Sequence, residues 1–236
     1  MPQSASEPLS ISTKWISKFK ELRILWAHDG NIKRPHVVLS SGAHSSSFFN
    51  AELLTQDPSL LAEACTDMVT LLSEYTHGEP KFDYMYTASY IVGPAMGGVL
   101  IAHGIADALG RYRGAPCFSG YVRQEKGTMV FWKSHLPVNS VVILADDVFT
   151  TGGSLKRTAT ALVDANCTVL PVVMVLVNRI GSGAGETHQF EGRHVIRLMD
   201  SHDTRWLPSK CELCVKGSEA ISPDGMENWK RLTARY

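Results

Sequence analysis

The chain has 236 residues, of which 44% are hydrophobic and 19% are charged, which suits one α/β domain with additions, or at most two small domains. That composition argues against wholesale disorder. The formal net charge is zero, which argues against a general nucleic-acid-binding protein, because such proteins carry a basic excess.

The sequence shows neither a secretory signal nor a membrane span. The N-terminus lacks a basic region followed by an apolar one. The longest apolar run, 169–177, contains a proline and is too short to cross a bilayer. Five widely scattered cysteines do not resemble a secreted disulfide framework. We therefore expect a cytoplasmic protein that binds neither membrane nor nucleic acid.

Apolar spacing predicts helices and strands that alternate along the chain. The expected helices are 14–26, 99–109, 154–165 and one that starts after Pro58 and is ended by His77 and Gly78. The expected strands are 37–39, 47–51, 84–92, 117–122, 141–146, 168–177 and 194–199. A charged, glycine-containing hairpin is expected over 123–138, a glycine-rich loop over 180–186, and an irregular tail after the last strand.

This alternation predicts an α/β fold with a mostly parallel sheet and right-handed crossovers. In such sheets ligands bind beyond the carboxyl ends of the strands, and the loops after Val92, Asp147 and Val177 all leave such ends. We expect residues 1–34 to form an N-terminal tail and helix that pack on a small hood, and residues 35–236 to form the main domain.

Residues 142–154 form the most informative stretch. An apolar run ends in two adjacent carboxylates, Asp146 and Asp147, and small or hydroxylated residues follow before a helical pattern begins. Small residues let backbone N–H groups surround an anion at a helix start, where the helix dipole favours negative charge. Two carboxylates beside such a cradle predict a ligand that carries both a phosphate and hydroxyl groups, a ribose phosphate. The alternative is a strand and a capped helix with only a structural role, but it does not explain why two adjacent acids occur together with the paired glycines Gly152 and Gly153.

This stretch resembles the phosphoribosyl-pyrophosphate signature of type I phosphoribosyltransferases. The resemblance implies their fold, a mostly parallel sheet flanked by helices, with a small N-terminal hood. It also implies that Asp146 and Asp147 bind the ribose hydroxyls and act in catalysis. The residues that it assigns to the 5′-phosphate are Thr150, Thr151, Gly152, Gly153 and Ser154.

A second glycine-rich loop, 93–98, also follows a strand and opens a helix. It is not a nucleoside-triphosphate P-loop, because Val99 and Leu100 stand where Lys and Ser or Thr are needed. By the resemblance it is the pyrophosphate loop, which acts with Mg²⁺ held mainly through substrate rather than by protein ligands. Its implied contacts are Ala95, Met96, Gly97 and Gly98.

Residues 41–51 resemble the N-terminal segment of orotate phosphoribosyltransferases. The resemblance implies that Phe48, Phe49 and Asn50 close over a pyrimidine, since a planar ring gains from an apolar wall. It also places His44 near pyrophosphate. Taken alone, the phenylalanines would indicate ordinary core and His44 a solvated turn. The other expected base contacts are Thr150, Arg179 and Lys156, with Arg157 as an alternative to Lys156.

The hairpin departs from the pattern of the family. Its cations Arg123, Lys126 and Lys133 are expected to shield the departing pyrophosphate. However, Gln124 stands where the family has a lysine, and Trp132 stands where it has the first of two arginines. This departure leaves open a transferase for another base, such as a purine, or a regulator that binds phosphoribosyl pyrophosphate without catalysis.

The leading hypothesis is therefore an Mg²⁺-dependent enzyme that makes orotidine 5′-monophosphate and pyrophosphate from orotate and phosphoribosyl pyrophosphate. The resemblance implies a homodimer, in which the hairpin reaches the neighbouring subunit. In the tail, Cys211 and Cys214 form a lone Cys-x-x-Cys, which we interpret as two reduced thiols. A zinc site shared between subunits or completed by a distant histidine stays open, because this motif supplies only half of a tetrahedral set.

Overall fold

The computed structural model describes residues 10–76, 84–131, 136–179, 189–201 and 203–235. The chain divides by contact into two compact units. Met1–Asn50 and Ser201–Tyr236 form one, which we call the terminal unit, and Ala51–Asp200 forms the other, the central unit. The terminal unit therefore combines residues from both ends of the chain.

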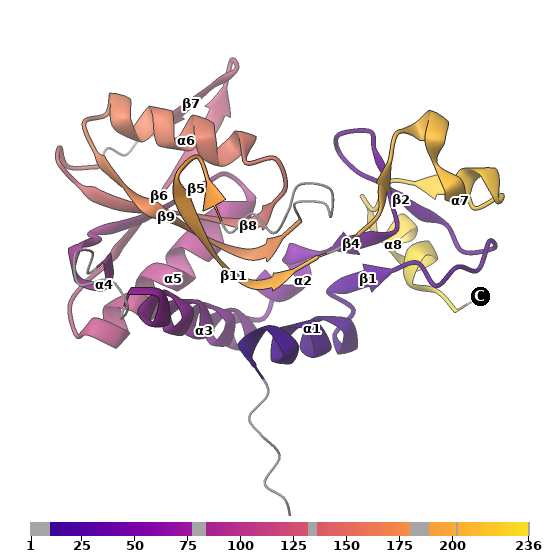
Figure 1. Ribbon diagram of the computed structural model, residues 1–236, viewed down its shortest axis with the longest axis horizontal. Coiled ribbons are helices and arrows are strands. Elements are labelled where there is room, and N and C mark those ends of the chain that lie inside the picture. Colours follow the sequence, from indigo (N-terminus) through magenta and orange to yellow (C-terminus); the bar gives the residue numbers. More distant parts are fainter. Residues whose placement is uncertain (1–9, 77–83, 132–135, 180–188, 202, 236) are drawn as a thin grey trace, which may run out of the picture. The chain divides into compact units, whose positions relative to one another are not determined.

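The central unit is built on a seven-stranded sheet in the order β10-β11-β9-β8-β5-β6-β7 (Figure 1). Its strands are β5 (Tyr90–Pro94), β6 (Phe118–Glu125), β7 (Thr128–Phe131), β8 (Val141–Phe149), β9 (Thr168–Asn178), β10 (Gln189–Phe190) and β11 (Arg193–Asp200). The five inner strands run parallel, and the two edge strands pair antiparallel. This pattern confirms the predicted mostly parallel sheet. It also places the carboxyl ends of the neighbouring strands β5, β8 and β9 on the same side of the unit.

Helices cover both faces of this sheet (Figure 1). They are α2 (Ala51–Thr55), α3 (Pro58–Thr76), α4 (Tyr84–Thr87), α5 (Gly97–Arg113) and α6 (Gly153–Asp164). Helices α3 and α5 pack together on one face, and α6 packs on the other. Because both faces are covered, the inner strands are continuously apolar, as in β9, where residues 172–177 are all fully buried.

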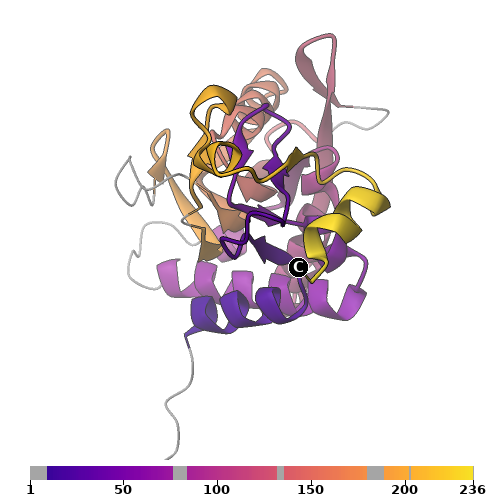
Figure 2. The same cartoon turned by 90° about the vertical axis from the view of Figure 1, so that its right-hand side faces the viewer.

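The terminal unit joins the two ends of the chain. Its elements are α1 (Ile11–Glu21), β1 (Leu25–Ala27), β2 (His36–Val38), β3 (His44–Ser45), β4 (Ser47–Phe49), β12 (Arg205–Trp206), the 3₁₀ turn η1 (Pro208–Lys210), α7 (Glu212–Val215), β13 (Ala220–Ile221) and α8 (Met226–Thr233). A four-stranded sheet has the order β12-β3-β2-β13, and β1 pairs with β4. Figure 2 shows the yellow C-terminal segment beside the indigo N-terminal strands. Trp26 fixes this pairing by donating from Nε1 to the Leu232 carbonyl at 2.8 Å.

The structure corrects several element predictions. The predicted strand 84–92 is split: residues 84–87 form the turn of helix α4, closed by the Ala88 amide on the Tyr84 carbonyl at 3.2 Å, and β5 begins at Tyr90. The predicted helix 14–26 ends at Glu21, because Arg23 takes a left-handed conformation (φ 57°) that leads into β1. The tail is not irregular, since it supplies two strands and two helices. The predicted loop 180–186 lies outside the described residues.

Within the described ranges, no helix is both long enough and apolar enough to cross a membrane.

Candidate active site

The two signature acids lie within β8, which continues to Phe149 rather than ending at residue 146 as predicted. Asp146 is buried and Asp147 is half-buried. The Asp147 amide donates to Asp146 Oδ1 at 2.9 Å, and the Val148 amide donates to Asp147 Oδ1 at 2.7 Å. Burial, and secondly the neighbouring Asp147 carboxylate, raise the pKa of Asp146 well above its usual value. The pair is therefore a strong hydrogen-bond acceptor for ligand hydroxyls or an electrostatic partner for a cation.

The five residues after β8 wrap a hollow of about 50 Å³ that Asp146 also lines. Helix α6 begins there, and its N-cap, Gly152, makes no side-chain cap bond. Gly152 has a φ of 73°, and a Cβ on it would overlap the rings of Phe149 and Phe190. The Gly153 amide donates to Thr151 Oγ1 at 3.4 Å, but Gly152 supplies no side-chain cap, so the start of α6 keeps donor capacity toward the hollow, where the dipole also favours an anion.

The 93–98 loop lies at the end of β5, the neighbour of β8 in the sheet. A Cβ on Gly97 would overlap the Asp147 carboxyl group, lying 2.6 Å from its Cγ. A Cβ on Gly93 would lie 2.8 Å from the Ala145 carbonyl oxygen. The absence of both side chains thus lets this loop lie against the acid-bearing strand. Helix α5 starts at Gly97, and it too has no side-chain cap.

Ala95 and Met96 occupy the middle of this loop and are joined by a cis peptide bond. The Ala95 amide donates to the Val122 carbonyl at 2.7 Å, which ties the loop to β6, and Met96 is largely exposed. The signature turn, the acid pair and the 93–98 loop therefore come together at one edge of the central sheet, as the sequence predicts.

The hairpin is formed by β6 and β7, with Arg123 opposite Val130. An ion pair of 3.2 Å joins Arg123 Nη2 to Glu125 Oε2. Lys126 is exposed in the turn, where it has a φ of 47°. Trp132 and Lys133 lie outside the described residues. The pyrophosphate-shielding role of these cations stays a prediction.

The residues assigned to the base lie in both units. In the terminal unit, the Phe48 ring lies 5.8 Å from that of Trp229, and Phe49 is buried with its ring 5.0 Å from that of Phe19. Asn50 follows Phe49 directly and donates its amide to the Ile24 carbonyl.

In the central unit, Lys156 Nζ pairs with Glu191 Oε1 at 2.6 Å. The buried Arg179 donates its amide to the Phe149 carbonyl at 2.7 Å. Base binding by all five of these residues, and by Thr150, stays a prediction.

His44 has surroundings that the sequence did not predict. It is buried in β3, and its Nδ1 lies 3.1 Å from His36 Nε2 and 3.3 Å from Cys214 Sγ. Burial, and then His44 and His28, lower the pKa of His36 to about 4. With Cys211, these side chains form a set of potential metal ligands inside the terminal unit. The sequence signal that would have found it is a histidine eight residues before His44, read together with the Cys-x-x-Cys. The expected pyrophosphate role of His44 stays a prediction.

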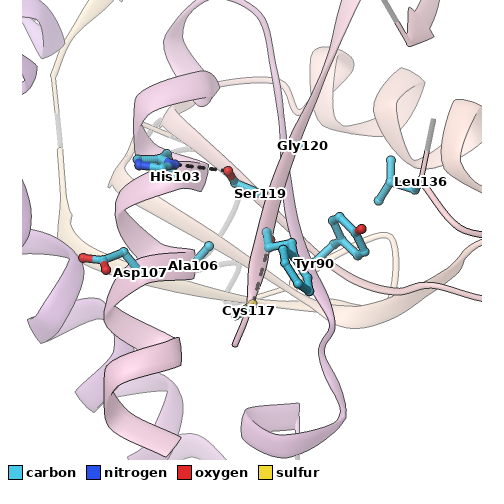
Figure 3. Close-up of a pocket in the computed structure, with 9 residues that line it drawn as sticks. Tyr90, His103, Ala106, Asp107, Cys117, Ser119, Gly120 and Leu136 are labelled. Carbon is cyan, nitrogen blue, oxygen red and sulfur yellow. Dashed lines mark hydrogen bonds between the residues drawn. The ribbon is translucent and has the colours of Figure 1, made fainter. Parts of the chain in front are cut away.

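A larger hollow, of about 520 Å³, lies at the opposite end of the parallel strands, beside the first residues of β5 and β6 (Figure 3). Tyr90 and Phe118, the first residues of β5 and β6, line it together with His103 of α5, whose Nδ1 lies 3.2 Å from Ser119 Oγ. Ligands of parallel sheets bind at the carboxyl ends of the strands. We therefore place the candidate active site at the smaller hollow, despite the larger volume of this one.

Known proteins resemble this chain over most of its length. An orotate phosphoribosyltransferase of Acidithiobacillus ferrooxidans is 29% identical over 204 residues, which cover 86% of this chain and 95% of that protein. An orotate phosphoribosyltransferase of Pelotomaculum thermopropionicum is 27% identical, with the same coverage. The crystal structure of orotate phosphoribosyltransferase from Aeropyrum pernix has a TM-score of 0.53 at 28% identity, and covers 78% of this chain and 92% of that chain.

The family match covers the elements that build the candidate site. Residues 69–197 match the family described as "Phosphoribosyl transferase domain", and this range includes β5, β8, both glycine-containing loops and the acid pair. Because that match spans more than half of the chain, this protein belongs to the phosphoribosyl transferase domain family.

Proposed function

We propose that this protein is an orotate phosphoribosyltransferase, which transfers the phosphoribosyl group of 5-phosphoribosyl 1-pyrophosphate to orotate. The products are orotidine 5′-monophosphate and pyrophosphate, so the reaction belongs to pyrimidine biosynthesis. The sequence relatives support orotate as the acceptor, since those named above are orotate phosphoribosyltransferases.

One observation carries the proposal for the donor substrate. The starts of α5 and α6, whose N-cap residues make no side-chain cap bond, follow neighbouring strands and flank a pair of carboxylates. Each helix start suits an anionic group, and the carboxylates suit hydroxyl groups. Phosphoribosyl pyrophosphate has this order of groups: a 5′-phosphate, two ribose hydroxyls and a pyrophosphate.

The arrangement suits catalysis by positioning and electrostatics. A ring nitrogen of orotate forms a bond to ribose C1 while the bond from C1 to the pyrophosphate oxygen breaks, and the ring-nitrogen proton passes to pyrophosphate or solvent. Positive charge develops on the sugar, where Asp146 and Asp147 stabilise it and hold the hydroxyls. Orotate is already anionic, so no strong general base is required.

We propose Mg²⁺ as the cofactor. Mg²⁺ prefers oxygen ligands and usually keeps substrate phosphates and waters around it. We therefore propose that the ion is held mainly through the substrate pyrophosphate at the 93–98 loop, with the half-buried Asp147 carboxylate nearby, beside Gly97. When bound, the ion would neutralise charge on the leaving group.

We also propose a cytoplasmic homodimer. None of the five cysteines, all of which lie in the described ranges, forms a disulfide, which suits a reducing compartment. The hairpin of β6 and β7 projects from the edge of the central sheet, where it is suited to reach a second subunit (Figure 1). Sedimentation equilibrium of the purified chain tests the dimer, and a monomer at micromolar concentration would refute it.

The first test is pyrophosphate release in the presence of Mg²⁺ and phosphoribosyl pyrophosphate, with orotate, uracil, hypoxanthine, xanthine and adenine offered separately. We expect release with orotate alone. Release with a purine instead would indicate a transferase for that base. Silence with every base, together with measurable binding of phosphoribosyl pyrophosphate, would support the non-catalytic regulator that the altered hairpin leaves open.

Replacing Asp146 with Asn should lower kcat/KM by about 10- to 100-fold, because a charged hydrogen bond of about 1.5–3 kcal/mol to the ribose is weakened. The ligand-free variant should nevertheless melt at a higher temperature. The raised pKa of Asp146 means that the folded state loses stability as pH rises from about 4 through the folded pKa. The gain in melting temperature should therefore grow with pH over that window.

Asp164→Asn is the matched control for this variant, because Asp164 is exposed at the end of α6. It should change neither activity nor the pH dependence of melting. If Asp146→Asn melted below the unmodified protein at neutral pH, the buried like-charge pair would not be the unfavourable feature that we describe.

Replacing Gly97 with Ala should reduce kcat/KM by roughly 100-fold, since the new Cβ must displace the Asp147 carboxyl group or the loop, and a shift of about 1 Å has that effect. Gly110→Ala, in the same helix, places its Cβ 3.4 Å from the nearest atom and should leave activity unchanged. Equal activity of the two variants in steady-state assays would contradict the tight approach of this loop to Asp147.

The double variant Gln124→Lys, Trp132→Arg should raise turnover with orotate by about tenfold, which corresponds to ~1.4 kcal/mol of added stabilisation of the leaving pyrophosphate. The control Gln56→Lys adds a positive charge at an exposed position away from the hairpin and should have no effect. Unchanged turnover in the double variant would show that the hairpin cations already present suffice.

A further inference from the structure

Four side chains from opposite ends of the chain meet in the terminal unit. His36 lies in β2 and His44 lies in β3, while Cys211 is the N-cap of the short helix α7 and Cys214 lies within that helix. One potential ligand atom from each lies within 4.8 Å of all the others. The two histidines and Cys211 are buried, so this is not an incidental surface grouping.

The spacing of these atoms matches one tetrahedral ion. His36 Nε2 lies 3.1 Å from His44 Nδ1, 3.3 Å from Cys211 Sγ and 3.5 Å from Cys214 Sγ, and Cys214 Sγ lies 3.3 Å from His44 Nδ1. Zinc bonds of about 2.0–2.3 Å in a tetrahedron separate the ligand atoms by about 3.3–3.8 Å. The observed distances fall close to this range, so small shifts of the side chains would admit the ion.

The hydrogen bonds around His36 fix the tautomer that a metal needs. Ser218 Oγ donates to the Arg34 carbonyl at 2.7 Å, so its oxygen serves as the acceptor for His36 Nδ1–H at 2.9 Å. The lone pair of His36 is therefore on Nε2 and points toward three other potential ligands. A single lone pair can accept only one good hydrogen bond from them, whereas a metal ion would use all four groups at once.

The chemistry of the set selects the ion. Two imidazole nitrogens and two thiolate sulfurs in a tetrahedron are typical of Zn²⁺, and carboxylate or water ligands would be expected for Mg²⁺ or Ca²⁺. Four protein ligands leave no open position for substrate, so the role is structural rather than catalytic.

We propose that His36, His44, Cys211 and Cys214 bind one Zn²⁺ ion that ties the C-terminal tail to the N-terminal strands. The ion joins positions about 170 residues apart in sequence, beside the short strand pairings β12–β3 and β13–β2 that link the same two segments. It explains the Cys-x-x-Cys by a structural role, and it would commit His44 to the ion in place of the pyrophosphate role that the resemblance implies.

Metal analysis of the full chain, produced with zinc in the medium, tests the site. We expect one zinc per chain, and no zinc in the double variant Cys211→Ser, Cys214→Ser. Cys117→Ser, a change at a partly exposed cysteine of the central unit, should keep its zinc. A zinc-free purified protein that also fails to take up added Zn²⁺ would overturn the proposal, as would a disulfide between Cys211 and Cys214 in the freshly purified protein.

Two measurements on folded protein guard against variants that fail to fold. Co²⁺ added to the chelator-stripped, otherwise unmodified protein should give the visible bands of a tetrahedral thiolate site, and an octahedral spectrum would refute the proposed site.

Ser218→Ala, which removes the acceptor for His36 Nδ1–H, should weaken Zn²⁺ binding by about 10- to 100-fold. The control Ser222→Ala, at a half-buried serine in the same tail, should leave Zn²⁺ affinity unchanged. Equal affinity of the two serine variants would contradict the assigned tautomer.

Discussion

The central unit is organised around two adjacent carboxylates at the end of a buried strand. Like charges next to each other, with Asp146 buried, are unfavourable in the ligand-free protein. Backbone amides of residues 147 and 148 offset part of this cost. A ligand that brings hydroxyl groups or a cation would offset the rest of this cost. The glycines at 93 and 97 follow from the same constraint, because a Cβ at either would press on β8 or on Asp147.

The parts of the site that the sequence could predict are local. The acid pair, the hydroxylated turn and the start of α6 are consecutive, so one stretch of sequence carries both their identity and their geometry. The 93–98 loop is more distant, but parallel strands bring their carboxyl ends to one edge, so the fold class was enough to place it. The hollow was also predictable, because the residues that line it all lie in one stretch of sequence, from Asp146 to Leu155.

The errors arise where short elements depend on tertiary contacts. Residues 84–92 are aromatic and apolar, and this composition is shared by buried strands and buried helical turns. In the folded chain Tyr84 and Met85 are both buried as consecutive residues of the helical turn, which the sequence pattern does not reveal. The end of α1 depends on a left-handed arginine, which carries no sequence signal, whereas a glycine there would have. The two-residue strands of the tail have no periodicity to detect and exist because β2 and β3 provide partners.

The terminal unit therefore depends on different physics from the central unit. The central sheet has a continuous apolar core, while the terminal unit has strands of two or three residues around a small cluster of Trp26, Val37, Ile221 and Leu232. Small cores of this kind usually need a metal or another cross-link. The His and Cys side chains lie where the two ends of the chain meet, so an ion there would reduce the conformational freedom of the unfolded chain most effectively. In the arrangement that we propose, the His and Cys cluster stabilises the terminal unit, while the transfer reaction takes place at the acid pair and the two helix starts of the central unit.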